Sequence, residues 1–314
     1  MTDNIWFWAG FMAFVLFMLA LDLGVFHRKS HTVSMKEALT WTGVWTLLAT
    51  LFGAWVWSSR GETAGLEFFT GYLIELSLSA DNVFVFSIIF SYFAVPAAYQ
   101  HKVLFWGVLS ALVLRFIMIW CGAALVERFM WVLYVFGAFL IITGIKMLVQ
   151  REAKHDPEAS PIVRLFRRFI PTSNEYDGDR FTTRVDGRLM ATPLLLVLVC
   201  VEISDVIFAV DSIPAIFAIT RDPFIVFTSN VFAIMGLRSL YFVLSGAVEK
   251  FYLLRPGLGI ILSFVGVKML LAHTAWKIPT PAALGVVVLV LAAAIVGSLV
   301  WPKRPTPDVP AGAV

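Results

Sequence analysis

Residues 75–86 read ELSLSADNVFVF, and they place Glu75, Asp81 and Asn82 inside a long apolar run with no Lys or Arg beside them. An acidic side chain at bilayer depth costs at least about 2.5 kcal/mol on insertion scales. Such a side chain is therefore expected to avoid lipid. The stretch predicts a membrane helix whose acids face a cavity, one another or an ion.

The composition of the whole chain favours the same environment. Of the 314 residues, 60% are hydrophobic and 14% are charged, and the mean hydropathy is +0.86. Too few polar side chains remain to cover a water-soluble surface. Cys121 and Cys200 lie inside apolar runs and form no spaced metal or redox motif, so they are expected to pack as small hydrophobes. The sequence holds no soluble catalytic constellation, phosphate loop or nucleic-acid patch, so we predict neither an enzyme nor a nucleic-acid partner.

The sequence predicts an all-α polytopic membrane protein with about nine transmembrane helices. Roughly 20 apolar residues cross about 30 Å of hydrocarbon. The first run has no basic segment before it and no small-residue cleavage signal after it, so we expect a retained helix and not a signal peptide. The runs cover residues 5–26, 39–57, 66–93, 103–125, 130–149, 191–219, 224–248, 258–272 and 282–301.

The distribution of Lys and Arg predicts the orientation, because cytoplasmic loops hold the excess. With the N-terminus outside, the outer side carries Arg60, Arg128, Arg221 and Lys277, against sixteen basic residues on the inner side. We therefore expect a multi-pass membrane protein with its N-terminus outside and its C-terminus cytoplasmic.

Residues 150–190 form the one long polar segment, which we interpret as a cytoplasmic linker. The stretch IVRLFRRFI (162–170) could add a short interfacial helix, and a solvated connector without function is the alternative. The predicted organisation is two leading transmembrane helices (1–60), a three-helix unit (61–149), the linker (150–190), a second three-helix unit (191–272), a final transmembrane helix (281–301) and a cytoplasmic tail (302–314).

The two three-helix units resemble each other in sequence. Setting Glu75 against Asp205 also aligns Asp81 with Asp211 and Asn82 with Ser212. Further along, GAFLIITGIKML (137–148) matches GIILSFVGVKML (259–270), and Arg115 and Arg238 occupy corresponding places in the middle helices. Because each unit has an odd number of spans, the second should enter the membrane from the opposite side. Such inverted repeats are common in secondary transporters, where the substrate binds between the repeats near the midplane.

The candidate ligands are all oxygen donors, whereas the five histidines fall at membrane edges or in loops. Oxygen-only sites favour hard divalent ions such as Mn²⁺, Mg²⁺ or Ca²⁺ over Zn²⁺ or Cu²⁺. We predict a metal site built from Glu75, Asp81, Asn82, Glu202, Asp205, Asp211 and Ser212.

The geometry within each acidic helix leaves two possibilities open. Six residues turn about 240° on a regular helix, so Glu75 and Asp81 do not share a face, whereas Glu75, Ser79 and Asn82 do. Either the two acids belong to layers about 9 Å apart along the axis, or the helix is unwound between them. In the second unit a break is favoured, because Pro214 cannot donate to the carbonyl of Val210, which leaves an oxygen beside Asp211.

Several charged residues are expected to support this site. Arg115 and Arg238 could hold the acids when no cation is bound, or could form purely structural ion pairs with them. Lys146 and Lys268 lie near helix ends and are expected to snorkel to the interface. Asp22 lies about one turn from the inner interface, where a link to Arg28 or Lys29 competes with a role in the site.

The two acidic motifs, ELSLSADNVFVF and VEISDVIFAVDSIPA, resemble those of the TerC family of bacterial integral membrane proteins, including its Alx-type members. The stretch LDLGVF (21–26) and the GIKML motif late in the first unit add to this resemblance. The family is associated by name with tellurium resistance, and several members are linked to Mn²⁺ export. The resemblance implies the same seven residues as the functional set.

We therefore expect a secondary transporter that exports Mn²⁺ and exchanges it for protons taken up by the crowded acids. The lipid bilayer, the metal ion and protons are the expected partners, and no tightly bound cofactor is predicted. Two other functions stay open. One is a membrane partner protein in metal or tellurite stress or in metal loading of secreted proteins, which would need residues 150–190 as its docking surface. The other is a proton-linked redox modulator that binds no metal.

Overall fold

A computed structural model describes residues 5–21, 33–149, 170–173, 175–185, 187–244, 252–272, 274 and 276–301. For Ile5, Leu21, Asp81 and Phe84 it describes the backbone alone. Asp22 with the LDLGVF motif, most of the predicted interfacial helix at 162–170 and the C-terminal tail lie outside the described residues.

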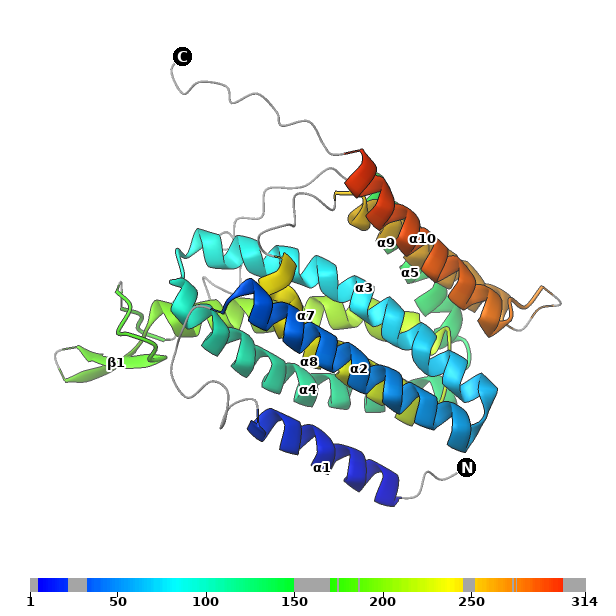
Figure 1. The fold of residues 1–314 in the computed structure, drawn as a ribbon, viewed down its shortest axis with the longest axis horizontal. Coiled ribbons are helices and arrows are strands. Elements are labelled where there is room, and N and C mark those ends of the chain that lie inside the picture. Colours follow the sequence, from blue (N-terminus) through cyan, green and yellow to red (C-terminus); the bar gives the residue numbers. More distant parts are fainter. Residues whose placement is uncertain are drawn as a thin grey trace, which may run out of the picture.

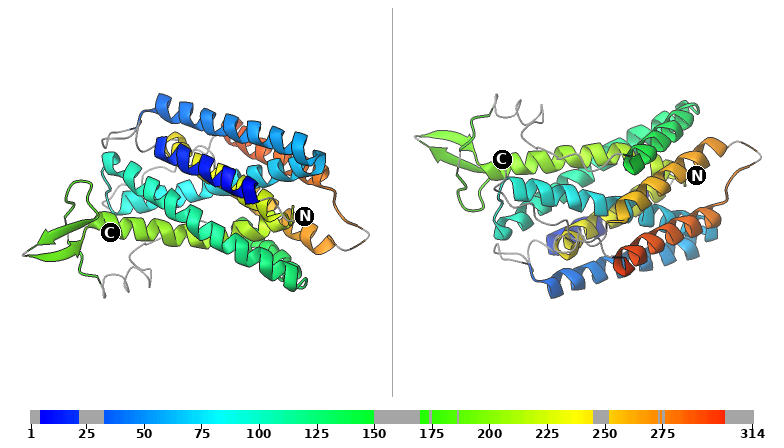
Figure 2. Two further views of the ribbon diagram at one scale, coloured as in Figure 1. Left: turned by 90° about the horizontal axis from the view of Figure 1, so that it is seen from below. Right: turned by 90° about the horizontal axis from the view of Figure 1, so that it is seen from above.

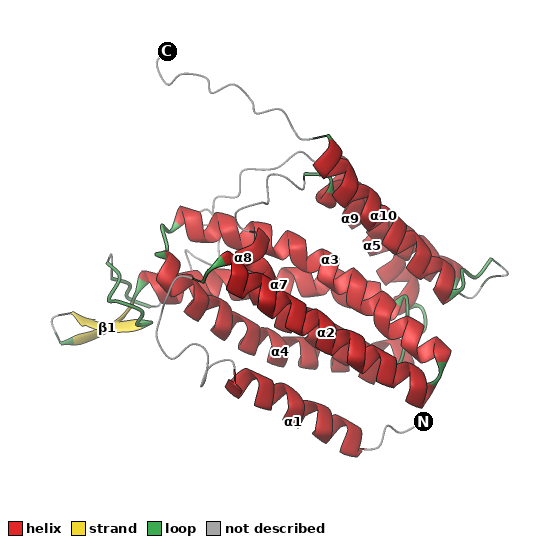
Figure 3. Ribbon diagram, viewed as in Figure 1, coloured by secondary structure: helices red, strands yellow, loops and turns green. Residues whose placement is uncertain are grey.

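The described chain is almost entirely helical, which confirms the predicted fold class (Figures 1 and 3). Each of the nine predicted runs coincides with a helix. Eight of these helices are long and apolar enough to span a membrane, while α1 is described over 17 residues. The helices are α1 (Ile5–Leu21), α2 (Met35–Arg60), α3 (Glu62–Tyr92), α4 (Ala97–Arg128), α5 (Val132–Val149), α7 (Pro193–Phe217), α8 (Pro223–Leu244), α9 (Leu254–Leu271) and α10 (Thr280–Val300).

Helix α8 forms the centre of the bundle, because α2, α3 and α4 all pack against it. Its first residue follows Asp222, whose carboxylate accepts a hydrogen bond from the backbone N–H of Phe224 at 2.9 Å. The same carboxylate pairs with Arg60 at the end of α2, also at 2.9 Å. Because α2, α3 and α4 surround it, almost every residue of α8 is buried. Polar residues on this helix therefore face other helices and not lipid.

Helices α5 and α9 make the closest helix–helix contact of the described structure, through four glycines that the repeat places in register. A Cβ atom on Gly137 would lie 3.0 Å from the carbonyl oxygen of Gly266, and one on Gly144 would lie 2.5 Å from that of Gly259. In the reverse direction, a Cβ atom on Gly266 would lie 2.7 Å from the carbonyl oxygen of Gly137, and one on Gly259 would lie 2.8 Å from that of Gly144. The two helices thus run antiparallel, as inverted units require, although the inverted repeat itself stays a prediction.

A β-hairpin that the sequence interpretation did not foresee lies at the end of the polar segment. Strand β1 (Thr182–Val185) pairs with β2 (Arg188–Ala191) in antiparallel register, and the hairpin projects from one end of the helices (Figure 1). The chain just before it is anchored to the bundle. Lys102 binds the carboxylate of Asp179 at 3.0 Å, and Tyr176 donates to the Phe93 carbonyl at 2.8 Å.

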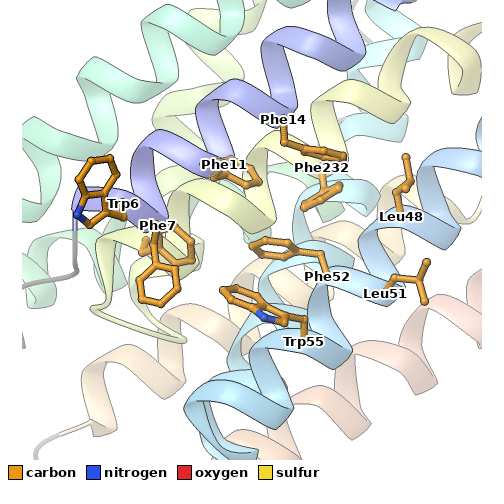
Figure 4. Close-up of a pocket in the computed structure, with 11 residues that line it drawn as sticks. Trp6, Phe7, Phe11, Phe14, Leu48, Leu51, Phe52, Trp55 and Phe232 are labelled. Carbon is orange, nitrogen blue, oxygen red and sulfur yellow. The ribbon is translucent and has the colours of Figure 1, made fainter.

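Helix α1 lies at the edge of the bundle (Figure 1) and packs on it through aromatic rings and through the buried Val15 and Leu19. Figure 2 shows the helices from two further sides. The ring of Phe11 lies 5.4 Å from that of Phe52 and 5.8 Å from that of Phe232. Beside these rings, an apolar groove of about 470 Å³ separates α1 from α2 (Figure 4). Trp6, Leu51 and other exposed apolar residues surround it, so the groove belongs to the lipid-facing surface and not to the acidic site.

Candidate functional site

Arg115 on α4 forms the centre of the buried polar layer. Its guanidinium makes a close ion pair with Glu75 of α3 and a second ion pair with Asp205 of α7, at 3.1 Å from Nη2 to Oδ1. The Nη1 atom also donates to Ser212 at 3.3 Å. All four side chains are buried. Glu75 and Asp205, which the repeat sets in corresponding positions, therefore meet on one arginine.

A cavity of about 120 Å³ adjoins this ion pair. It has room for roughly four water molecules at about 30 Å³ each, which suits a partly hydrated ion. The structure thus brings four of the seven predicted ligands, and the arginine, to one space. The polar residues that line the cavity are Glu75, Asn82, Arg115, Thr143, Asp211 and Ser212, and the apolar ones are Leu78, Met147, Phe208 and Leu262.

Buried oxygen atoms without a hydrogen-bond partner lie along the same side of α3. Glu75 Oε2, Ser79 Oγ and Asn82 Oδ1 are fully buried and accept no hydrogen bond within the described part of the chain. Leaving a buried polar group unpaired costs about 1–3 kcal/mol. Hard divalent cations are bound by such oxygen atoms, so this side of α3 is suited to hold an ion or its water molecules.

Of the other three predicted ligands, Asp205 pairs with Arg115 but does not line this cavity. Glu202 accepts a close hydrogen bond from Ser110 of α4 and does not line the cavity. The side chain of Asp81 lies outside the described residues. Across the described ranges, no three His, Cys, Asp or Glu side chains lie close enough together to hold a metal ion. In this structure the Arg115 guanidinium itself supplies the positive charge that holds Glu75 and Asp205.

Helices α3 and α7 are both continuous through their acidic motifs. The residues from Glu75 to Asp81 are helical, so the two acids belong to successive layers. The favoured break in α7 is wrong: Pro214 stands in the last turn, and the helix continues to Phe217. The proline removes one hydrogen bond, but the residues from Ser212 to Phe217 are all buried, and their packing holds the turn in place.

The predicted supporting charges differ in their surroundings. Lys268 does not snorkel, since it is 6% exposed and donates from Nζ to the carbonyl of Ala218 at 2.9 Å. A cation there stabilises the carbonyl end of α7. Arg238 is buried on α8 and lines a small cavity of about 10 Å³ with Asp205. Lys146 is exposed near the end of α5, where snorkelling stays a prediction.

Asn230 is a buried polar residue that the sequence interpretation missed. It lies on α8, is fully buried, and neither amide atom has a hydrogen-bond partner in the described structure. Phe227, one turn before it, packs on Phe116, and Ile234, one turn after it, shares the small cavity with Ala111. Asn230 therefore lies at about the same level along the bundle as Arg115.

Asn230→Leu should raise stability. Leucine removes an unpaired buried amide, so we expect a gain of about 1–3 kcal/mol in the free energy of unfolding. Thermal unfolding in detergent measures the effect. Thr228→Val on the same helix is the control, because the Thr228 hydroxyl already donates to the Phe224 carbonyl at 2.8 Å. If Asn230→Leu unfolded at a lower temperature than the parent, the Asn230 amide would have to form hydrogen bonds in the folded protein.

The helices and the buried polar layer define a multi-pass integral membrane protein. A family model described as "Integral membrane protein TerC family" matches residues 60–306. The chain belongs to this family, as its motifs predict.

Relatives match almost the full length. A protein of Escherichia coli K12 named "Putative membrane-bound redox modulator Alx" is 50% identical over 289 residues, which cover 89% of this chain and 90% of the relative. An uncharacterized membrane protein of Myxococcus xanthus is 57% identical over 302 residues, covering 96% and 94%. One from Rickettsia felis is 39% identical over 293 residues, covering 93% and 97%. No solved structure matches.

Proposed function

We propose that this protein is a secondary transporter that exports a divalent cation, with Mn²⁺ as its substrate, through the cavity between α3 and α7. The observation that carries the proposal is the cavity itself. Carboxylate, amide and hydroxyl groups from α3, α5 and α7 line it, and Glu75 Oε2 and Asn82 Oδ1 are buried without a partner in the described chain. These are the ligand types of Mn²⁺, Mg²⁺ and Ca²⁺.

Exchange for protons follows from the chemistry of the same groups. When the cation leaves, three carboxylates in a region of low dielectric, Glu75, Asp205 and Asp211, lose its positive charge, and the single charge of Arg115 balances only part of theirs. Protonation is one way for buried carboxylates to recover neutrality. We therefore propose that protons enter the cell as the metal leaves it.

Two measurements on purified protein test the metal. Mn²⁺ should raise the melting temperature, because a ligand that binds only the folded state adds RT ln(1 + [L]/Kd), about 2.7 kcal/mol at 100 times Kd. In proteoliposomes, an inward proton gradient should drive Mn²⁺ out. Protein that is neither stabilised by Mn²⁺ nor able to move it would contradict the proposal.

The name of the Escherichia coli relative favours a second candidate, a membrane-bound redox modulator. Thiol chemistry would be the simplest basis for that role in this chain, and neither Cys121 on α4 nor Cys200 on α7 is part of a disulfide. Cys121 is exposed, Cys200 is buried, and neither lines the cavity.

The Cys121→Ser/Cys200→Ser double variant separates the two functions. We expect it to export Mn²⁺ at the rate of the parent protein, because neither thiol belongs to the proposed site. The measurement is Mn²⁺ flux in proteoliposomes under reducing and oxidising buffers. A double variant that has lost transport, or a parent whose transport follows the redox buffer, would favour the thiol-based role.

A further inference from the structure

We propose that Arg115 is a tethered competitor of the transported cation. Its guanidinium holds the carboxylates while the cation is absent, and the cation must displace it in order to bind. This inference rests on the proposed function and states how the same site is regulated.

The ion-pair geometry is the first argument. Arg115 is 1% exposed; its Nη1 atom donates to Glu75 and Ser212, and its Nε and Nη2 atoms donate to Asp205. Three of the seven predicted ligands are thus occupied by one side chain. A guanidinium stays charged in a protein and matches carboxylates with its fixed fork of donors. Arg115 therefore supplies the counter-charge that these buried acids need before any metal arrives.

The cavity supplies the second argument. Arg115 lines it together with Glu75, whose Oε2 atom is unpartnered in the described chain, and with Asp211. An ion that enters the cavity meets Glu75 from the side that the guanidinium leaves open. A divalent cation and a guanidinium on the same carboxylate repel each other in a low-dielectric interior. Metal binding and the Arg115 ion pair are therefore mutually unfavourable.

The two units differ at this position. Arg238, which corresponds to Arg115 in the repeat, lies on α8 and does not line the 120 Å³ cavity. It lines the small cavity of about 10 Å³ together with Asp205, and this space holds about one water molecule and not a hydrated ion. Of the two arginines, Arg115 is therefore the one that competes with the cation.

The test compares Mn²⁺-dependent thermal stabilisation of the parent, Arg115→Gln, Arg115→Lys and Arg128→Gln. Apparent affinity is reduced by the fraction of molecules that are competent to bind. If Arg115 holds the acids in about nine-tenths of metal-free molecules, Arg115→Gln lowers the half-saturating Mn²⁺ concentration by about tenfold. Its metal-free melting temperature should fall, because two buried carboxylates lose their partner. Arg128, exposed at the end of the same helix, is the matched control, and its variant should titrate like the parent.

Arg115→Lys covers the case in which Arg115→Gln does not fold. Lysine keeps the charge but lacks the fork that bridges two carboxylates, so the half-saturating concentration should fall by a smaller factor. A merely structural arginine would give lower stability and weaker binding together. If the parent is stabilised by Mn²⁺ and the folded variant titrates at or above the parent's concentration, the competitor role is wrong. If the parent itself does not respond to Mn²⁺, the transport proposal fails instead.

Discussion

Glu75→Gln and Asp211→Asn proteins should insert and fold but export Mn²⁺ at least about 10- to 100-fold more slowly than the parent. That factor is typical even of residues that only support a metal ligand, and these two line the cavity directly. Both substitutions keep the size of the side chain and remove a charge. Initial rates of Mn²⁺ flux in proteoliposomes at equal protein density give the comparison.

The matched control is Glu62→Gln, which removes an exposed acid from the first turn of α3, the helix that carries Glu75. Asp81→Asn belongs to the same test, because the sequence assigns Asp81 to the site. Normal flux through the Glu75 and Asp211 variants would show that the ion follows another route.

Among the glycines whose surroundings the structure describes, Gly144 should tolerate an added methyl group least. The new Cβ would lie 2.5 Å from the Gly259 carbonyl oxygen and 2.8 Å from the backbone nitrogen of Ser263, and neither backbone atom can move without shifting α9. Overpacking of this kind costs about 1–3 kcal/mol. Because α5 and α9 both line the cavity, through Thr143, Met147 and Leu262, transport should fall as well.

Gly43→Ala is the control for Gly144→Ala. Nothing lies within 4 Å of a Cβ atom at Gly43 on α2, so alanine should keep or slightly raise stability through its better helix propensity. Melting temperatures of both variants in the same detergent make the comparison. Equal stability of the two would mean that α5 and α9 are packed less tightly than the glycine contacts require.

The sequence predicted the helices and the pairing of buried acids with Arg115, because both leave local signals. Apolar runs of about 20 residues indicate spans without any knowledge of packing. The alignment of Glu75 with Asp205 pointed to a shared role, and the two acids do meet on Arg115.

What the sequence could not predict depends on contacts between distant segments. Lys268 looks like an interfacial lysine until α9 is packed beside the end of α7. Asn230 follows Thr228 and Ser229 in an apolar helix, and nothing local distinguishes its unpaired amide from their hydroxyls, which bond to the helix backbone. The hairpin did leave a signal: Asp186–Gly187 between TTRV and RLMA is a typical two-residue turn.

Anomalous diffraction from crystals grown with MnCl₂ tests the central claim most directly. The account predicts an anomalous peak in the cavity between α3 and α7, within ligand distance of Glu75 and Asp211, with the Arg115 guanidinium moved away from Glu75. A Mn²⁺ peak elsewhere in the membrane region, or an unchanged Arg115–Glu75 pair in protein that transports Mn²⁺, would contradict it.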